Sequence, residues 1–262
     1  MLQVDGRKLK VVIPARYGSS RLPGKPLIDL AGKVLVVRVY EAVVMALGDR
    51  AEIIVAVDDD RIRDHLLRLD IPSTMTRSDH ESGTDRSAEV ARLHSWQADD
   101  IVMNVQGDEP LVPIELLRAF ASFCEDRDEF SMGTIAAPIN DREQIHDPNC
   151  VKICLNSVGD ALFFSRAPVP FRRDHIEAGW FVENYLRHVG IYAYRNNVLQ
   201  RLTMQPPCEL EVIERLEQLR AMWLGVPIHV LKWGCAPPHG VDTPADADRV
   251  FQIFEEIEKC RV

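Results

Sequence analysis

The segment that most constrains the fold is a strand near the amino terminus that runs directly into a basic loop. Residues 11–13 are three consecutive β-branched residues, which is typical of a strand buried on both faces. Pro14 ends the pairing because it has no N–H to donate. The loop beyond it carries Arg16, Arg21 and Lys25 among glycines and serines. Cations and backbone N–H groups at the carboxyl end of a first strand favour a phosphate-bearing ligand, such as a nucleoside triphosphate.

This loop matches neither of the two common phosphate-binding motifs. Lys25 is followed by Pro26, which breaks the GxxxxGK[ST] spacing of the ATPase loop, and Gly18 is followed by two serines, which breaks GxGxxG. The loop resembles instead the signature loop of nucleotidyltransferases that activate sugars. A solvated basic loop after an ordinary strand is the alternative for any single cation.

Length and charge limit the class of protein. The 262 residues, 46% of them hydrophobic, can bury a large core as one extended domain or as a main domain with an inserted lobe. The formal charge of −9 argues against nucleic acid and anionic membranes as partners, because both select basic surfaces. The first residues contain no apolar signal region, and the apolar runs end short of a membrane span, so we expect a cytoplasmic enzyme.

Helix and strand patterns alternate through the first half of the chain. Apolar residues recur at helical spacing over 34–47, a buried strand covers 53–57, and a short strand follows a second helix at 73–76. We interpret the three aspartates at 58–60 as caps of that second helix rather than as metal ligands. The alternation predicts a parallel sheet with helices on both faces.

A polar, turn-rich segment, residues 75–86, leads into a further helix predicted at 88–93. A helix amino terminus after a glycine-containing loop presents free N–H groups, which suit a phosphate or the edge of a base. Simple helix capping by Ser82 or Thr84 is the alternative.

Two aspartates are candidate metal ligands. Asp108 follows a strand that begins at 101 and stands beside a glycine, at the sheet edge where α/β proteins bind ligands. Mg²⁺ prefers one or two carboxylates together with phosphate oxygens. Asp242 is the second candidate, since Thr243 is the better cap of a last helix that has Pro244 in its first turn.

The chain changes character after a helix predicted at 114–125. Strands predicted at 134–139, 151–155 and 161–164 follow one another without long helices, which favours an antiparallel portion or lobe. Residues 208–223 have the apolar stripe of one amphipathic helix, and a last strand is predicted at 227–232.

Alternation over 187–195 places four residues on one face of a strand: His188, Gly190, Tyr192 and Tyr194. That face is either an exposed sheet surface or a hydrogen-bonding wall for a hydroxylated, carboxylated substrate.

Eight blocks of sequence, in this order, are similar to those of the 3-deoxy-manno-octulosonate cytidylyltransferases, also called CMP-KDO synthetases: IPARYGSSRLPGKPL, MTRSDHESGTDR, NVQGDEPL, VKI, FSRAPVPF, RHVGIYAYR, LEVIERLEQLRAMWLG and HGVDTPAD. The resemblance implies an α/β, Rossmann-like nucleotidyltransferase fold with a mostly parallel central sheet and helices on both faces. It implies a single domain over 1–262 with a smaller inserted antiparallel lobe at about 134–195, for sugar binding and dimerisation.

The resemblance also implies a reaction. CMP is transferred from CTP to the anomeric hydroxyl of 3-deoxy-D-manno-octulosonate (KDO), giving CMP-KDO and pyrophosphate for the inner core of lipopolysaccharide. Mg²⁺ would assist an in-line attack on the α-phosphorus, which needs positioning and charge neutralisation more than a covalent nucleophile. The implied partners are CTP and KDO, with a homodimer as the assembly.

Residue roles follow from the matching blocks. The implied catalytic residues are Arg16, Arg21 and Lys25, which grip the triphosphate, and Asp108 and Asp242, which ligate Mg²⁺. The implied nucleotide-binding residues are Pro14, Ala15, Arg16, Arg21, Lys25, Met75, Arg77, Ser82, Gly83 and Gln106. The implied sugar-binding residues are Arg166, His188, Tyr192, Glu217 and Gln218, with Arg166 as the partner of the sugar carboxylate because its fork binds two oxygens.

Two other functions remain open at this point. An enzyme for 8-amino-KDO or another acidic sugar would use the same loop and the same aspartates. A nucleotide-binding regulator without catalysis would keep the fold, although the presence of both aspartates argues against it. Glu81 stands where relatives often have glutamine, which leaves base contacts at that position in question.

Overall fold

The computed structural model describes residues 9–18, 22–80, 82–173 and 182–260. The chain folds into two compact units. The first comprises residues up to 121 together with those from 238 onward, and the second comprises residues 122–237. Each unit is taken in turn.

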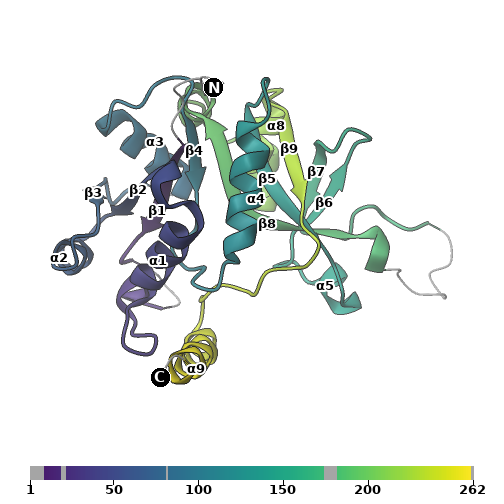
Figure 1. Cartoon of the computed structure of the whole chain (residues 1–262). Helices are drawn as coiled ribbons and strands as arrows, with labels where there is room; N and C mark the ends of the chain where they lie inside the picture. The colour runs from purple at the N-terminus through teal and green to yellow at the C-terminus, as the bar shows by residue number, and fades with distance from the viewer. Residues whose placement is uncertain (1–8, 19–21, 81, 174–181, 261–262) are drawn as a thin grey trace, which may run out of the picture. The chain divides into compact units, whose positions relative to one another are not determined.

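The first unit is built on four parallel strands (Figure 1). They are β1 (Leu9–Ala15), β2 (Ala51–Val57), β3 (Ser73–Met75) and β4 (Ile101–Asn104), in the spatial order β3-β2-β1-β4. The helices α1 (Leu35–Leu47), α2 (Asp60–Leu67) and α3 (Gly83–Leu93) connect them. The predicted parallel sheet is confirmed, and the carboxyl ends of all four strands share one edge.

Apolar burial explains why β1 is central. Residues 11–13 are completely buried, and Val12 lies between Ile54 of β2 and Asn104 of β4.

Two short 3₁₀ helices also belong to the first unit: η1 (Lys25–Leu27) follows the basic loop, and η2 (Gly48–Arg50) follows α1. Helix α4 (Ile114–Glu125) has the predicted bounds and ends in the second unit.

The last helix, α9 (Pro244–Lys259), returns to the first unit. Arg38 of α1 anchors it, since its Nη1 lies 2.8 Å from Glu258 Oε1 while its other guanidinium nitrogens bond the carbonyls of residues 30 and 31. Thr243 caps α9 by accepting a hydrogen bond from Asp246 N, and Asp246 completes a capping box. The predicted cap is therefore confirmed.

The second unit holds the antiparallel strands. β5 (Met132–Pro138) pairs antiparallel with β8 (Leu186–Arg195) and parallel with β9 (Ile228–Lys232). β6 (Lys152–Leu155) pairs antiparallel with β7 (Ala161–Ser165) and with β8. The helices of the second unit are α5 (Arg142–His146), η4 (Val182–Asn184), α6 (Asn196–Thr203), α7 (Glu209–Glu214) and α8 (Gln218–Trp223). The antiparallel portion predicted from closely spaced strands is confirmed.

The single helix predicted over 208–223 is wrong. The chain forms α7 and α8, separated at Arg215, which has the left-handed φ of 54°. Glu214 fixes this break, because its carboxylate accepts hydrogen bonds from Ser165 Oγ at 2.7 Å and from Arg166 N at 2.9 Å. As a result the expected apolar stripe is interrupted, and Ile213 is 69% exposed.

Capping by the three aspartates after β2 is confirmed for only one of them. Asp59 caps α2 by accepting from Arg61 N at 2.9 Å, and Asp60 is the first residue of the helix. Asp58 points elsewhere: its two carboxylate oxygens contact Tyr17 and Arg86.

The lobe predicted at residues 134–195 falls within the second unit, and its role in sugar binding and dimerisation stays a prediction.

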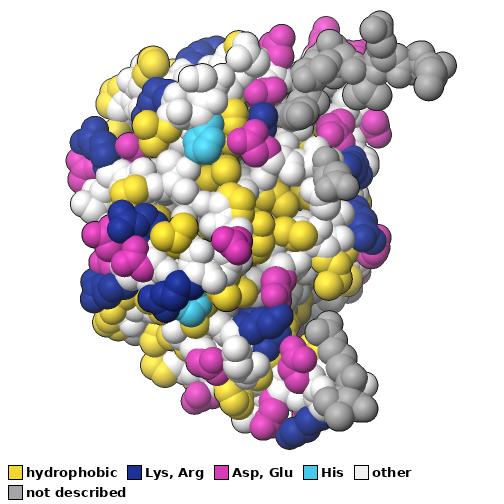
Figure 2. Space-filling model, turned by 60° about the vertical axis from the view of Figure 1, so that its left-hand side comes forward, with side chains coloured by type: hydrophobic (Ala, Val, Ile, Leu, Met, Phe, Trp, Pro, Cys, Tyr) yellow, Lys and Arg dark blue, Asp and Glu magenta, His cyan; other side chains and the backbone are white. Residues whose placement is uncertain are grey.

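None of the helices that the structure describes has the length and apolar character needed to cross a membrane. On the face drawn in Figure 2, acidic and basic side chains lie interspersed around apolar ones.

Candidate functional site

The two aspartates singled out from the sequence meet at one cation. Lys25 Nζ lies 2.7 Å from Asp108 Oδ2 and 3.1 Å from Asp242 Oδ1. Lys25 begins η1 after the basic loop, Asp108 follows β4, and Asp242 directly precedes the cap of α9. Residues distant in the sequence therefore form one cluster of two carboxylates and an ammonium at the carboxyl edge of the parallel strands.

Two glycines make this convergence possible. The backbone N–H of Val241 donates to the carbonyl of Asp108 at 2.8 Å, which holds the two aspartate-bearing segments side by side. A Cβ on Gly240 would lie 2.7 Å from that same carbonyl oxygen, and a Cβ on Gly107 would lie 2.2 Å from the carbonyl oxygen of Pro14. Only glycine permits such close approaches of two backbones.

The cluster suits a magnesium ion that also touches a nucleotide. In the described part of the chain, no group of three or more His, Cys, Asp or Glu side chains is placed to hold a metal ion. Mg²⁺ commonly takes only one or two carboxylates and completes its shell with phosphate oxygens and water. Asp108 and Asp242, whose oxygens already share a cationic partner, fit that donor set, and their assignment as metal ligands stays a prediction.

The basic loop is closed at its base. Gly24 N donates to Tyr17 O at 3.1 Å, and Gly24 has a φ of 70°, which favours glycine. Arg16 is exposed and has no hydrogen-bond or ion-pair partner among the described residues. Arg21 lies outside the described residues. Of the three predicted phosphate-binding cations, Lys25 is in the aspartate cluster and Arg16 is available to an anion.

The expected base-binding segment packs onto the end of β1. Helix α3 starts at Gly83, five residues earlier than predicted, because Ser82 caps it by accepting from Asp85 N at 3.0 Å. A Cβ on Gly83 would lie 3.4 Å from Pro14 Cγ and 3.1 Å from Asn104 Nδ2. Three predicted nucleotide-binding residues, Pro14, Ser82 and Gly83, thus come together at this helix terminus.

Asn104 is a further candidate that no sequence motif singles out. It ends β4, is 1% exposed, and its Oδ1 has no hydrogen-bond partner among the described residues. Its position between β1 and α3 places an amide beside the predicted base-binding residues. A polar residue at the end of a strand otherwise made of apolar residues was the signal available in the sequence.

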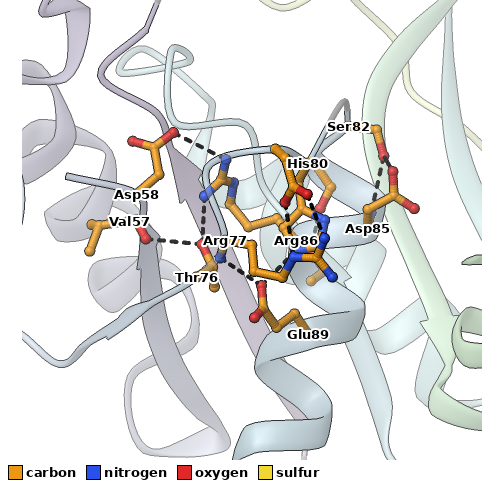
Figure 3. A network of polar contacts seen from close by, with 12 residues as sticks. Val57, Asp58, Thr76, Arg77, His80, Ser82, Asp85, Arg86 and Glu89 are labelled. Atoms are coloured by element: carbon orange, nitrogen blue, oxygen red, sulfur yellow. Dashed lines mark hydrogen bonds and ion pairs between the residues drawn. The ribbon is translucent and has the colours of Figure 1, made fainter.

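Met75 is the last residue of β3, and Arg77 follows two residues later (Figure 3 labels Arg77). The Arg77 guanidinium forms a two-nitrogen contact with Asp79, with Nε 2.9 Å from Oδ1, and its backbone N–H donates to Glu89 Oε2 at 2.9 Å. Burial opposes ionisation of Glu89, but hydrogen bonds from Arg77 N and His80 outweigh it and lower the pKa of the carboxyl. Met75 is 37% exposed.

The remaining nucleotide candidates are less informative. Ala15 is buried at the end of β1, and Gln106 is half-buried beyond β4. The question raised by Glu81 falls outside the described residues. Every predicted triphosphate, base and metal residue belongs to the first unit.

Three of the four residues predicted to share one face of β8, His188, Tyr192 and Tyr194, lie together there and form its aromatic face, whose role as a wall for a substrate stays a prediction. The rings of His188 and Tyr192 lie 5.2 Å apart, and those of Tyr192 and Tyr194 lie 6.0 Å apart. Phe164 of β7 meets His188 edge-on at 5.3 Å. An irregularity in the pairing of β5 and β8 accompanies this cluster, since Thr134 is opposite Tyr192 while the next residue, Ile135, is opposite Val189.

Hydrogen bonding fixes the tautomer of His188. Thr134 Oγ1 lies 2.9 Å from the carbonyl oxygen of Ile191 and 3.2 Å from that of Val189, and both oxygens can only accept. The hydroxyl proton is therefore used there, and Oγ1 accepts from His188 Nε2–H at 3.0 Å. Burial, followed by the charge of Arg187, lowers the pKa of His188 to about 3. His188 is thus neutral near pH 7 and offers Nδ1 as an acceptor.

Arg166 is bound to backbone carbonyls. Its guanidinium donates to Glu214 O and Pro148 O, each at 2.7 Å, and to Arg215 O at 3.2 Å. Lys152, fully buried, donates to Arg166 O at 2.6 Å. In this arrangement Arg166 joins α7 to neighbouring loops, and its role as partner of a sugar carboxylate stays a prediction.

Glu217 and Gln218 stand at the start of α8. Gln218 is 6% exposed, and its buried Nε2 has no hydrogen-bond acceptor among the described residues. Burial, then the charges of Tyr194 and Glu217, raise the pKa of Tyr192 well above its usual value, so Glu217 lies near the aromatic face. A buried amide donor without an acceptor is costly, so Gln218 Nε2 is a candidate donor to a ligand oxygen.

Comparison with known proteins adds independent information. A family model described as cytidylyltransferase matches residues 10–228. A protein of Paraburkholderia phytofirmans (strain DSM 17436 / LMG 22146 / PsJN), named 3-deoxy-manno-octulosonate cytidylyltransferase 2, is 54% identical over 250 residues, which cover 95% of each chain. A 3-deoxy-manno-octulosonate cytidylyltransferase of Hahella chejuensis (strain KCTC 2396) is 49% identical over 248 residues, which cover 93% of this chain and 96% of the relative.

A solved structure is similar over nearly the whole chain. It is a CMP:2-keto-3-deoxy-manno-octonic acid synthetase in complex with CTP, with a TM-score of 0.86 and 40% sequence identity. The alignment covers 95% of this chain and 99% of that one.

Proposed function

Because the chain belongs to the cytidylyltransferase family, we propose that it transfers CMP from CTP to the anomeric hydroxyl of KDO, giving CMP-KDO and pyrophosphate. The relatives named above carry the KDO-specific activity in their names, and the chain spans nearly their full length. The enzyme is a nucleotidyltransferase with two small-molecule substrates.

The observation that carries this proposal is the meeting of Asp108 and Asp242 at Lys25. Transfer of a nucleotidyl group needs the charge of the phosphates to be neutralised and the attacking hydroxyl to be held in line with the leaving pyrophosphate. Lys25 supplies positive charge at the cluster, with Arg16 and Arg21 assigned to the triphosphate from the basic loop. Preorganised charges of this kind are often the largest contribution to catalysis.

Asp108 and Asp242 are the residues that would hold Mg²⁺. When bound, the ion neutralises phosphate charge and makes a coordinated hydroxyl more acidic. Lys25 bridges the two carboxylates in the structure and would place its ammonium beside a phosphate held at this cluster. The cluster would thus bring a lysine and two carboxylates together at the phosphates.

The nucleoside is assigned to Pro14, Ala15, Met75, Arg77, Ser82, Gly83 and Gln106, several of which surround the start of α3. KDO is assigned to the second unit, at Arg166, His188, Tyr192, Glu217 and Gln218. Neutral His188 provides an acceptor for a sugar hydroxyl, and Gln218 Nε2, which has no acceptor among the described residues, provides a donor for a hydroxyl or carboxylate oxygen.

We also propose that the protein acts in the cytoplasm as a homodimer formed through residues 134–195, in the synthesis of the lipopolysaccharide inner core. Three apolar side chains within those residues support an interface, since Val158, Leu162 and Phe171 are 73%, 57% and 71% exposed. Large exposed apolar side chains are candidates for burial by a second protein surface.

The test is a comparison of pyrophosphate release with CTP and Mg²⁺ in the presence of KDO, 8-amino-KDO, neuraminic acid or no sugar. We expect release with KDO at the highest kcat/KM and none without sugar. Faster release with 8-amino-KDO or neuraminic acid would reassign the sugar. CTP binding without any sugar-dependent release would replace the enzyme by a nucleotide-binding regulator.

A further inference from the structure

Asp58 occupies a position that helix capping does not explain. It follows β2 directly, at the same edge of the sheet as Asp108, and its side chain is 9% exposed. One carboxylate oxygen, Oδ1, accepts from Tyr17 N at 2.8 Å, and the other, Oδ2, accepts from Arg86 Nη2 at 3.2 Å (Figure 3 shows the second contact). Two segments that surround the nucleotide candidates thus meet on one carboxylate.

The contact with Tyr17 holds the basic loop at its base. Tyr17 O accepts from Gly24 N, so residue 17 is the point at which the loop closes on itself. The ring of Tyr17 also lies against the Arg61 guanidinium, whose carbon is 3.5 Å from the ring centroid, and Asp59 holds that guanidinium by an ion pair at 2.6 Å. The residues after β2 therefore contact both the backbone of Tyr17, through Asp58, and its ring, through Arg61.

The contact with Arg86 reaches the segment expected to bind the base. Arg86 is 2% exposed, and besides Asp58 it donates from Nη1 to Thr76 Oγ1. Its backbone N–H donates to the carbonyl of Ser82, the cap of α3. A buried guanidinium needs a countercharge, so removal of the Asp58 carboxylate would destabilise the position of Arg86 and of Thr76, to which Arg86 donates.

We propose that Asp58 is a positioning residue that holds Tyr17, at the base of the basic loop, and Arg86 of α3 in the arrangement that binds the triphosphate of CTP. The proposal rests on the proposed function, specifically on the binding of the triphosphate by this loop. Among the described residues, the Asp58 carboxylate bonds Tyr17 and Arg86, neither of which is a predicted metal ligand or sugar candidate, and Asp58 acts through these two residues.

The experiment measures the equilibrium affinities of CTP and CMP, by calorimetry with Mg²⁺, for the wild-type protein, Asp58→Ala and Asp58→Asn. The informative quantity is the ratio Kd(CMP)/Kd(CTP), because a general loss of folded protein lowers both affinities alike. Asp58→Ala removes both contacts. Asp58→Asn keeps an oxygen for Tyr17 N–H but presents an uncharged amide to Arg86.

Asp100→Ala is the matched control. Asp100 is another aspartate with little exposure, 6%, and its carboxylate accepts a backbone hydrogen bond, from Gln97 N at 2.8 Å. It precedes β4, at the opposite end of the strands from the loop. Its loss should cost stability without changing the affinity ratio.

We expect the ratio to fall by about tenfold in Asp58→Ala, the scale of one lost hydrogen bond to a charged group, and by less in Asp58→Asn. A wild-type ratio in the folded Asp58 variants would overturn the inference. A wild-type protein that binds CTP no more tightly than CMP would instead overturn the assignment of the triphosphate to the loop.

A measurement on the unaltered protein covers the case in which the Asp58 variants fail to fold. The Tyr17 amide, bonded to Asp58, should exchange with deuterium at least tenfold more slowly than the amide of exposed Gly18, after correction for intrinsic rates, because a hydrogen-bonded amide must open before it exchanges. Equal protection of the two amides would contradict the proposed grip on the loop.

Discussion

Asp108 and Asp242 accept from the same ammonium group, that of Lys25, at 2.7 and 3.1 Å. One carboxylate follows the fourth parallel strand and the other precedes the last helix, and a backbone hydrogen bond from residue 241 to the carbonyl of residue 108 joins them. Two carboxylates that share a cation before any ligand binds are preorganised to share a different one.

Replacing either aspartate should remove most of the activity. We expect Asp108→Asn or Asp242→Asn to lower kcat by at least ~10²-fold, the scale of a lost electrostatic contact to the transition state. Steady-state pyrophosphate release measures it. Asp64→Asn, at an exposed aspartate that pairs with Arg63, should keep wild-type turnover. Near-normal turnover in both cluster variants would defeat the metal assignment.

Removing Lys25 should make the cluster more receptive to a divalent cation. In Lys25→Met the two carboxylates lose their shared countercharge, and a bound Mg²⁺ relieves their repulsion. We expect millimolar Mg²⁺ without nucleotide to raise Tm by about 2–4 °C more than in the wild type, corresponding to about 1 kcal/mol.

The control for that prediction is Lys33→Met, which removes an exposed lysine paired with Glu41 at 2.6 Å. Its Mg²⁺ response should equal that of the wild type. Equal responses of all three proteins would argue that Asp108 and Asp242 do not bind the ion together.

His188 should make the protein sensitive to acid. Burial lowers its pKa to about 3 in the folded protein, below the value near 6.5 of an unfolded histidine. Between these values the unfolded chain binds more protons, so the free energy of unfolding falls as pH decreases from 6.5 towards 3, by up to about 1.4 kcal/mol per pH unit. Urea unfolding of the wild type and His188→Gln at pH 7 and pH 5 measures this contribution.

The His188→Gln protein should lose less stability than the wild type over that interval. Glutamine can still donate to Thr134 but does not titrate. An identical pH dependence in both proteins would mean that His188 is accessible enough to protonate without cost.

Replacing Gln218 by leucine should weaken the binding of KDO without lowering the stability of the protein. Its Nε2 is buried without an acceptor among the described residues, so Gln218→Leu removes an unsatisfied donor while keeping much of the volume. We expect unchanged or higher Tm, together with a rise of about tenfold in KM for KDO, corresponding to one lost hydrogen bond of about 1.4 kcal/mol. The KM for CTP serves as the internal reference and should not change. A marked loss of stability with unaltered KM would assign Gln218 to the core instead.

The sequence predicts the parallel half of this fold well because its signals are local. Buried β-branched runs, helical spacing and strand-end polar residues indicate β1, α1 and Asp108, and the bounds of α4 agree with the expectation. Thr243 was identified as a cap from its neighbours alone. Each of these features is decided within a few residues of chain.

The errors arise where contacts between distant segments decide the structure. The helix expected over 208–223 breaks after Glu214, whose partners Ser165 and Arg166 leave no periodic trace in the sequence. The local pattern predicts capping for both Asp58 and Asp59, because nothing in the neighbouring sequence distinguishes the two. Only the structure shows that one caps α2 while the other holds Tyr17 and Arg86.

The central claim is that Asp108 and Asp242 bind one Mg²⁺ that also contacts the triphosphate. A crystal structure with CTP, Mg²⁺ and a non-reactive KDO analogue tests it most directly. The account predicts one ion about 2.1 Å from an oxygen of each carboxylate and from a phosphate oxygen, with Lys25 turned to the nucleotide. A magnesium ion bound only by phosphates, with the two aspartates still paired to Lys25, would contradict it.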